Sequence, residues 1–217
     1  MTEDRYPGYD VLSKQAGLSW NEATRRTIEQ RLDIRQEPQF FDAGQWQTLG
    51  ALCDRIVPQT GQRPTVPLAA MLDARLTSGR TDGFRRAKLP EQGEAWRRGL
   101  GALDAESQRL HSRRFHELSV AQQDALLLAV QRGDATCEAW GDMAPAEFFS
   151  HRVLLDIAAA YYSHPSSWSE VGFGGPASPR GYVRMEFDRR DPWEAAEALE
   201  ADPDSALRAE RENRRVR

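Results

Sequence analysis

Glu147 and His151 are the residues whose types and spacing come closest to a metal site in this chain of 217 residues. They lie four residues apart on one face of an expected helix, where Asp156 or His164 would supply a third ligand. Di-iron bundles repeat a Glu-x-x-His spacing on two helices, and this sequence shows it on neither. A histidine that is hydrogen-bonded at the edge of the core is therefore the better interpretation of His151. A small metal-binding helical enzyme is the less favoured hypothesis.

No other motif for catalysis or cofactor binding stands out. The patterns GxSxG, HExxH, CxxC and CxxCH are missing from the sequence. Residues 172–181 superficially resemble a phosphate-binding loop, but two prolines remove backbone donors and no helix start follows. The two cysteines, Cys53 and Cys137, are expected to be free thiols, with a single disulfide as the less favoured alternative. We therefore expect no catalytic residue, no metal and no cofactor on this chain.

Charge and hydropathy argue against two further classes of function. With 29 basic and 33 acidic residues the formal net charge is −4, which argues against nucleic-acid binding because phosphate contacts need a basic face. The longest apolar run, residues 153–162, is about half as long as a membrane helix, so we expect no direct membrane insertion. The first residues lack the pattern of a signal peptide. We expect the chain in the cytoplasm, or in the periplasm if a partner that carries a signal exports both.

Helices must position these residues, and the sequence predicts several helix ends. Capping boxes mark three helix starts, at Ser19, Asp42 and Ser119. The first of these helices is expected over residues 20–35, and Gly133 is expected to end the third. Pro145 begins the most apolar helix, which we expect to be the central helix of a bundle.

The fold class that follows is mainly α: a compact helical bundle with an extended, Gly/Pro/aromatic-rich C-terminal arm. Four parts are expected along the chain: an N-terminal arm and polar helix (1–38), a helical core (39–163), an extended interface arm and short helix (164–195), and a charged tail (196–217). Asp191 would cap the short helix, with Pro192 in its first turn. The tail alternates charges and is expected to be a solvated helix or disordered.

Residues 164–184 have neither helical nor strand periodicity, and they combine three prolines and four glycines with aromatic residues. Such a stretch runs over a surface, either its own or that of another chain. In the first interpretation it folds back and caps the bundle, so that its aromatic residues are core. In the second it forms much of an interface, because Trp, Tyr and Arg dominate binding hot spots. Both interpretations hold if the stretch turns one aromatic face to the bundle and another to a partner.

Two stretches of the sequence resemble the gluconate 2-dehydrogenase subunit 3 family. One begins with Tyr161-Tyr-Ser-His-Pro and continues through Trp168, Gly172-Phe-Gly-Gly-Pro-Ala-Ser-Pro-Arg-Gly-Tyr and Asp191-Pro-Trp-Glu194. The other is the helix that ends in Leu49-Gly-Ala-Leu-Cys-Asp-Arg-Ile-Val-Pro58, with Phe40-Phe41 before it. Phe148-Phe149, before the tyrosines, fits as well, and the resemblance covers roughly residues 39–195.

This resemblance implies a small, mainly helical subunit without a catalytic centre of its own. It implies a large partner, an FAD-dependent dehydrogenase of the glucose–methanol–choline (GMC) class that oxidises sugars, sugar acids or glycosides. Some complexes add a cytochrome c subunit that takes the electrons. The small subunit is implied to stabilise and mature the large one, and in many members it carries a twin-arginine signal that the start of this sequence does not show. A transient chaperone that leaves the mature flavoprotein is the alternative.

The partner interface is expected on the arm and on the end of the preceding helix. Its residues are Tyr161, Tyr162, His164, Trp168, Phe173, Pro176, Arg180, Tyr182, Arg184 and Trp193. The aromatic side chains would be anchors, and the arginines would pair with charges of the partner. Ordering such an arm costs entropy, so we expect it to be mobile without the partner. A chain truncated at Ser163 is expected to fold but not to assemble.

Overall fold

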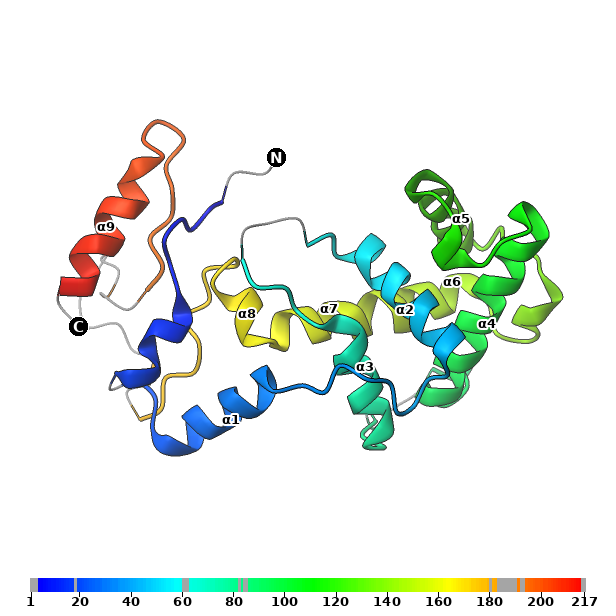
Figure 1. The fold of residues 1–217 in the computed structure, drawn as a ribbon, viewed down its shortest axis with the longest axis horizontal. Helices are drawn as coiled ribbons and strands as arrows, with labels where there is room; N and C mark the ends of the chain where they lie inside the picture. Colours follow the sequence, from blue (N-terminus) through cyan, green and yellow to red (C-terminus); the bar gives the residue numbers. More distant parts are fainter. Residues whose placement is uncertain are drawn as a thin grey trace. The chain divides into compact units, whose positions relative to one another are not determined.

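The computed structural model describes residues 4–17, 19–59, 63–81, 83, 86–179, 181–182, 191 and 194–215. The chain is mainly helical, as the sequence predicts: helices account for 59% of it, and the described residues contain no strand. Figure 1 shows the helices along the chain, from α1 to α9. The chain divides into two compact units. Unit 1 comprises Met1–Asp33, Gly61–Val66 and Tyr162–Arg217, and unit 2 comprises Ile34–Thr60 and Pro67–Tyr161.

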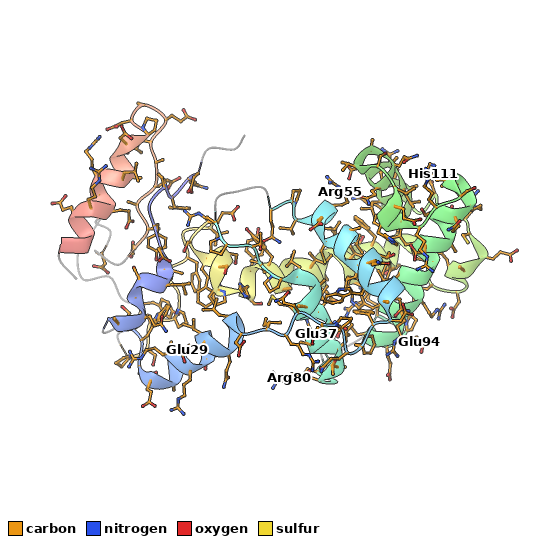
Figure 2. All side chains as sticks on the ribbon, in the orientation of Figure 1. Glu29, Glu37, Arg55, Arg80, Glu94 and His111 are labelled. Carbon is orange, nitrogen blue, oxygen red and sulfur yellow. The ribbon has the colours of Figure 1, made fainter. Side chains whose placement is uncertain are left out.

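Unit 2 is the helical core. Its helices are α2 (Ala43–Ile56), α3 (Leu68–Thr77), α4 (Gln92–His111), α5 (Val120–Arg132), α6 (Pro145–Phe148) and α7 (Leu154–Ser163), with the last residues of α7 assigned to unit 1. α2 packs against α3, α4 and α5, and it buries Leu49 and Leu52 completely. Arg55 of α2, labelled in Figure 2, forms an ion pair with Asp124 of α5 at 2.8 Å.

Three sequence signals at the ends of these helices are confirmed. Asp42 and Ser119 each form a capping box with the glutamine three residues later. Gly133 ends α5 with a φ of 81°, a left-handed conformation that glycine adopts without strain. The helices of unit 2 therefore begin and end where local side-chain chemistry requires.

The apolar segment after Pro145 is helical to Ser163 but changes its winding. Residues Phe149–Val153 form a π-helix between α6 and α7. One face of the segment, with Phe148, Val153 and Ile157, is buried, whereas Leu154 and Leu155 on α7 are exposed, and the central place of this helix stays a prediction. The helices α2 and α4 pack against each other and against several further elements of unit 2.

Phe148 links α6 to α4 through an unusually close contact. Its ring meets Trp96 edge to face at 5.6 Å between ring centroids. A Cβ atom added to Gly99 of α4 would lie 2.1 Å from the same ring. Only a residue without a side chain therefore fits beside Phe148 at this point.

Asp73 fastens the segment before α2 to helix α3. Its buried carboxylate accepts hydrogen bonds from the backbone N–H groups of Gln39, Phe40 and Phe41 at 2.8, 3.0 and 3.1 Å. A buried carboxylate needs such donors, and these backbone groups need acceptors. The carboxylate thus fixes the Phe40-Phe41 pair within unit 2.

A second buried carboxylate, Asp156, explains how α7 accommodates an acidic residue. One carboxylate oxygen accepts hydrogen bonds from the side chain of Gln92 at 2.9 Å and from the indole N–H of Trp96 at 2.7 Å. The guanidinium of Arg152 lies 3.6 Å from the same oxygen. Asp156 is therefore a polar link between α4 and α7.

Unit 1 brings both ends of the chain together. Its helical parts are a 3-10 segment (Val11–Ala16), α1 (Glu22–Leu32), α8 (Pro165–Trp168) and α9 (Asp204–Arg215). Its core consists of Tyr9, Val11, Trp20, Ile28, Trp168 and Ala195. The N-terminal arm expected from the sequence is therefore part of a hydrophobic core that it shares with the C-terminal part.

The start of α1 differs from the sequence prediction. Asn21, rather than Ser19, is the N-cap, and its side chain accepts a hydrogen bond from the N–H of Thr24 at 2.9 Å. Asn and Ser are about equally good caps, so the pattern alone could not choose between two starts only two residues apart. The helix also ends at Leu32, before the predicted residue 35.

Two expectations for the C-terminal part are corrected. The arm includes the one-turn helix α8, because the side chain of His164 caps it and Pro165 fits its first turn. The short helix expected after Asp191 begins at residues 192–193, which lie outside the described residues, and it does not extend over residues 194–198, which are not helical. The charged tail contains α9, which buries Ala206 and Glu210.

Candidate partner-binding surface

Trp168 organises the surroundings of the arm from inside unit 1. Its ring is buried, and its indole N–H donates a hydrogen bond to the carbonyl of Tyr162 at 2.9 Å. The ring of Phe173 packs edge to face on it, with 5.4 Å between centroids. The carbonyl of Trp168 accepts a further hydrogen bond from the N–H of Phe173 at 2.9 Å. Trp168 thus holds the ring of Phe173 and the backbone of Tyr162 while its own ring remains buried.

Three aromatic side chains in the described part of unit 1 are exposed. Tyr162 is 61% exposed, Phe173 43% and Tyr182 69%. The hydroxyl of Tyr182 donates a hydrogen bond to the carbonyl of Gly175 at 3.4 Å. We call Tyr162, Val171, Phe173 and Tyr182, all exposed and all in unit 1, the aromatic surface. Large apolar side chains that stay in water are candidates for contact with another molecule.

The N-terminal segment, residues 4–21, lies against the loop that carries this surface, residues 169–178. The N–H of Val11 donates to the hydroxyl of Ser169 at 3.1 Å. The ammonium group of Lys14 donates to the carbonyl of Gly174 at 2.9 Å. At the far end, the N–H of Asn21 donates to the carbonyl of Ser178 at 2.7 Å. Contacts therefore run along the whole loop.

Two glycines allow this close approach. Gly172 and Gly175 have φ angles of 70° and 69°, in the left-handed region that glycine tolerates. A Cβ at Gly172 would lie 2.4 Å from the ring of Tyr6, and one at Gly175 would lie 3.0 Å from the side chain of Val11. The glycine-rich composition of the loop is thus explained by packing against the N-terminal segment and by backbone conformation.

The residues expected at the interface fall into three groups. Those that the structure buries are Tyr161, His164 and Trp168, and Pro176 is half-buried. Those that the structure leaves exposed are Tyr162, Phe173 and Tyr182. Arg180, Arg184 and Trp193 lie outside the described residues. Within the arm, Trp168 therefore enters the core, as the first interpretation expects, whereas Phe173 and Tyr182 remain exposed.

His164 has a local structural role. Its buried ring accepts a hydrogen bond through Nδ1 from the N–H of Ser166 at 3.2 Å, which caps α8. Burial lowers the pKa of His164 below the ordinary value of a histidine. The neutral ring is thus the form that the fold requires, because a protonated Nδ1 could not accept this hydrogen bond.

The part that the N-terminal segment plays in the core of unit 1 does not follow from the sequence pattern. Tyr9, Val11 and Trp20 are buried, although the segment reads as a polar arm. The feature of the sequence that could have indicated their burial is that these apolar residues stand among charged ones. Their partners, more than 140 positions later in the sequence in the case of Trp168, could not be read from local spacing.

Of the candidate metal ligands, only two side chains lie close together. Glu147 and His151 lie 3.5 Å apart, nearest oxygen to nearest nitrogen. Within the part of the chain that the structure describes, no group of three or more His, Cys, Asp and Glu side chains could hold a metal ion. Asp156 is already engaged with Gln92 and Trp96, and His164 caps α8. Glu147 and His151 therefore pair with each other, whereas Asp156 and His164 have other structural partners.

The remaining sequence expectations concern the thiols and the membrane. Cys53 and Cys137 are both free, and Cys53 is buried. Burial raises the pKa of the Cys53 thiol far above its ordinary range, which keeps it protonated. Among the described residues, no helix combines the length and the apolar character needed to cross a membrane.

Comparison with known families adds independent evidence. Residues 43–175 match the family described as gluconate 2-dehydrogenase subunit 3. No curated protein and no solved structure matches the chain. The matched region starts at the first residue of α2 and ends within the loop 169–178, somewhat inside the limits expected from the sequence. It covers more than half of the 217 residues, and the chain therefore belongs to the gluconate 2-dehydrogenase subunit 3 family.

Proposed function

We propose that this chain is a non-catalytic accessory subunit that binds, stabilises and helps to mature a large FAD-dependent dehydrogenase of the GMC class. The observation that carries the proposal is the family match over residues 43–175, because the name of that family is the name of a dehydrogenase subunit. The same matched region includes Tyr162, Val171 and Phe173 of the aromatic surface. Family membership and surface chemistry thus support one conclusion.

The chemistry belongs to the partner in this proposal. The large subunit carries FAD and oxidises sugars, sugar acids or glycosides, and a cytochrome c subunit receives the electrons in complexes that contain one. This chain holds no cofactor and contributes no catalytic residue. Its contribution is burial of surface, which favours the folded, assembled form of the flavoprotein by mass action.

The aromatic surface is suited to that task. Burying a large apolar side chain contributes about 1.5–3 kcal/mol relative to leaving it in water. The ring of Phe173 packs on Trp168, so that binding restricts little of its motion. Tyrosine also offers a hydroxyl that remains hydrogen-bonded in a partly wet interface. A few such anchors carry most of the affinity in typical complexes.

Affinity purification of the tagged full chain from its native host tests the proposal. We expect a large second chain near one-to-one stoichiometry, identified by mass spectrometry, and a flavin band in the visible absorption spectrum of the eluate. A colourless, solitary protein under gentle conditions would contradict a stable subunit. A flavoprotein captured in much less than equal amount would instead indicate a chaperone that leaves after maturation.

Truncation at Ser163 is not a suitable test of the interface. It would remove Trp168 and Ala195, which belong to the same core as Tyr9, Val11 and Trp20. Loss of assembly would then report the loss of unit 1 rather than of a contact. Single substitutions on the aromatic surface avoid this difficulty, since their side chains are exposed.

A further inference from the structure

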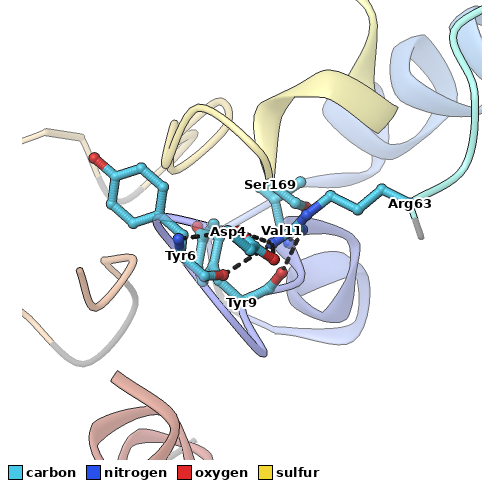
Figure 3. A network of polar contacts seen from close by, with 6 residues as sticks. All are labelled: Asp4, Tyr6, Tyr9, Val11, Arg63 and Ser169. Atoms are coloured by element: carbon cyan, nitrogen blue, oxygen red, sulfur yellow. Dashed lines mark hydrogen bonds and ion pairs between the residues drawn. The ribbon is translucent and has the colours of Figure 1, made fainter. Parts of the chain in front are cut away.

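Arg63 lies on the connection between α2 and α3, yet its guanidinium binds the N-terminal segment (Figure 3). Its side chain donates to the carbonyl of Tyr9 at 3.0 Å and to that of Tyr6 at 2.8 Å. It also forms an ion pair with the carboxylate of Asp4 at 2.9 Å. One cation thus fixes three points of the segment between residues 4 and 9.

The segment held in this way reaches the loop 169–178 a few residues later. Figure 3 shows the N–H of Val11 meeting Ser169 next to the contacts of Arg63 with Tyr9. Val11 and Tyr9 are buried in the core that also contains Trp168. A continuous series of contacts therefore joins Arg63 to the loop through the N-terminal segment.

We propose that Arg63 is a positioning residue that, through the N-terminal segment, orders the loop 169–178 and its aromatic surface before any partner binds. This inference rests on the proposed function for its biological meaning, but the ordering itself is a property of the isolated chain. It replaces the expectation of an arm that is mobile without its partner for this part of the chain.

The physical reason is that the loop has few means of ordering itself. It contains Gly172, Gly174 and Gly175, and glycine loses more conformational freedom on folding than any other residue. The N-terminal segment supplies Lys14 and Val11 as donors to the loop, and Tyr6 covers Gly172. A loop ordered in advance loses less entropy on binding, so the complex forms faster and more tightly.

Hydrogen exchange of the isolated full chain, followed by mass spectrometry, tests the inference with two matched arginines. Arg63→Gln removes the clamp on the N-terminal segment. Arg55→Gln is the control, because Arg55 is as exposed as Arg63, 21% each, and its ion pair with Asp124 lies in unit 2. We expect Arg63→Gln to accelerate exchange roughly tenfold in peptides covering both residues 4–16 and residues 169–178, since it removes a charged donor from the carbonyls of Tyr6 and Tyr9 and the ion pair with Asp4. Arg55→Gln should leave both peptides unchanged.

Two results would overturn the inference. In the first, Arg63→Gln accelerates exchange in residues 4–16 while residues 169–178 keep their protection, so that the loop is ordered by other means. In the second, the loop of the unmodified chain already exchanges at the rate of an unstructured peptide. If Arg63→Gln fails to fold, Arg63→Lys keeps the charge but cannot reach three acceptors at once, and it should give a smaller acceleration in the same peptides.

A binding measurement separates this inference from the proposed function. With the purified large subunit, Arg63→Gln should lower the association rate constant several-fold while Arg55→Gln does not. If the unmodified chain binds no flavoprotein, the proposed function fails, and the exchange experiment still decides whether Arg63 orders the loop. If it binds and the rate constants of the two variants are equal, ordering by Arg63 has no part in assembly and the inference is wrong.

Discussion

Lys14 donates a hydrogen bond to the carbonyl of Gly174 at 2.9 Å across 160 positions of sequence. Lys14 is buried, so this contact is made inside unit 1 rather than at its edge. Charge-assisted hydrogen bonds of this kind are stronger than neutral ones. The relationship shows that the loop next to the aromatic surface is built by both ends of the chain.

The aromatic surface can be tested with a matched pair of exposed side chains. Phe173 and Leu128 are each 43% exposed, but Leu128 lies on α5 in unit 2. We expect Phe173→Ala to weaken binding of the large subunit by about 1.5–3 kcal/mol, or 10- to 150-fold, because an anchor side chain is lost. Leu128→Ala should change the dissociation constant by less than about twofold. Equal losses for the two variants, measured by calorimetry, would contradict the assignment of the surface.

The contact between Gly99 and Phe148 predicts opposite effects for two glycines of the same helix. Gly99→Ala would force a methyl group into the ring of Phe148, and we expect it to destabilise the chain by about 1–3 kcal/mol. Gly101→Ala meets nothing within 4 Å and should stabilise α4 by about 0.5–1 kcal/mol. Urea unfolding followed by circular dichroism measures both. Stabilisation by Gly99→Ala would show that the helices separate easily at this point.

Removing the carboxylate of Asp73 should be more damaging than most surface changes. Asp73→Ala leaves the N–H groups of Gln39, Phe40 and Phe41 without their acceptor, at about 1–3 kcal/mol for each group that stays buried. Asp73→Asn keeps one acceptor oxygen and should lie between the unmodified chain and Asp73→Ala. The free energy of unfolding in urea, measured for the unmodified chain and for both variants, shows whether their stabilities follow this order. If Asp73→Ala is as stable as the unmodified chain, the segment before α2 contributes little to unit 2.

His164 predicts a loss of stability as the pH falls. Burial lowers its pKa in the folded chain, so the unfolded chain, with an ordinary pKa of about 6.5, takes up the proton first. Stability from this group is complete above that value, declines as the pH falls through it, and stops declining below the folded pKa. His164→Asn can cap α8 without titrating. The difference in unfolding free energy between the two proteins, measured from pH 8 to pH 5, isolates His164 from the other histidines. A difference that does not depend on pH would contradict the neutral cap.

Local signals in the sequence predicted the helices well and the arrangement of the two chain ends poorly. Asp42, Ser119 and Gly133 act through neighbours three or four residues away, and their predictions are confirmed. The pairing of Val11 with Ser169, 158 positions apart, leaves no local pattern. The sequence could not predict which aromatic residues of the arm are buried. Trp168 and Phe173 lie in the same Gly- and Pro-rich stretch, and only the packing of the folded chain buries one and exposes the other.

The division of the chain also sets an order of events during synthesis. Unit 2 consists of one stretch of chain from Ile34 to Tyr161, interrupted only by the loop Gly61–Val66, which belongs to unit 1. Unit 1 needs residues from both ends, so its core cannot close until the ribosome has added Trp168 and later Ala195. Parts of a chain generally fold as they leave the ribosome. The helical core of unit 2 can therefore form on the nascent chain while the N-terminal segment is still unpacked. The aromatic surface is therefore assembled only after Ala195 has been added, and shorter fragments have no assembled surface with which to compete for a partner.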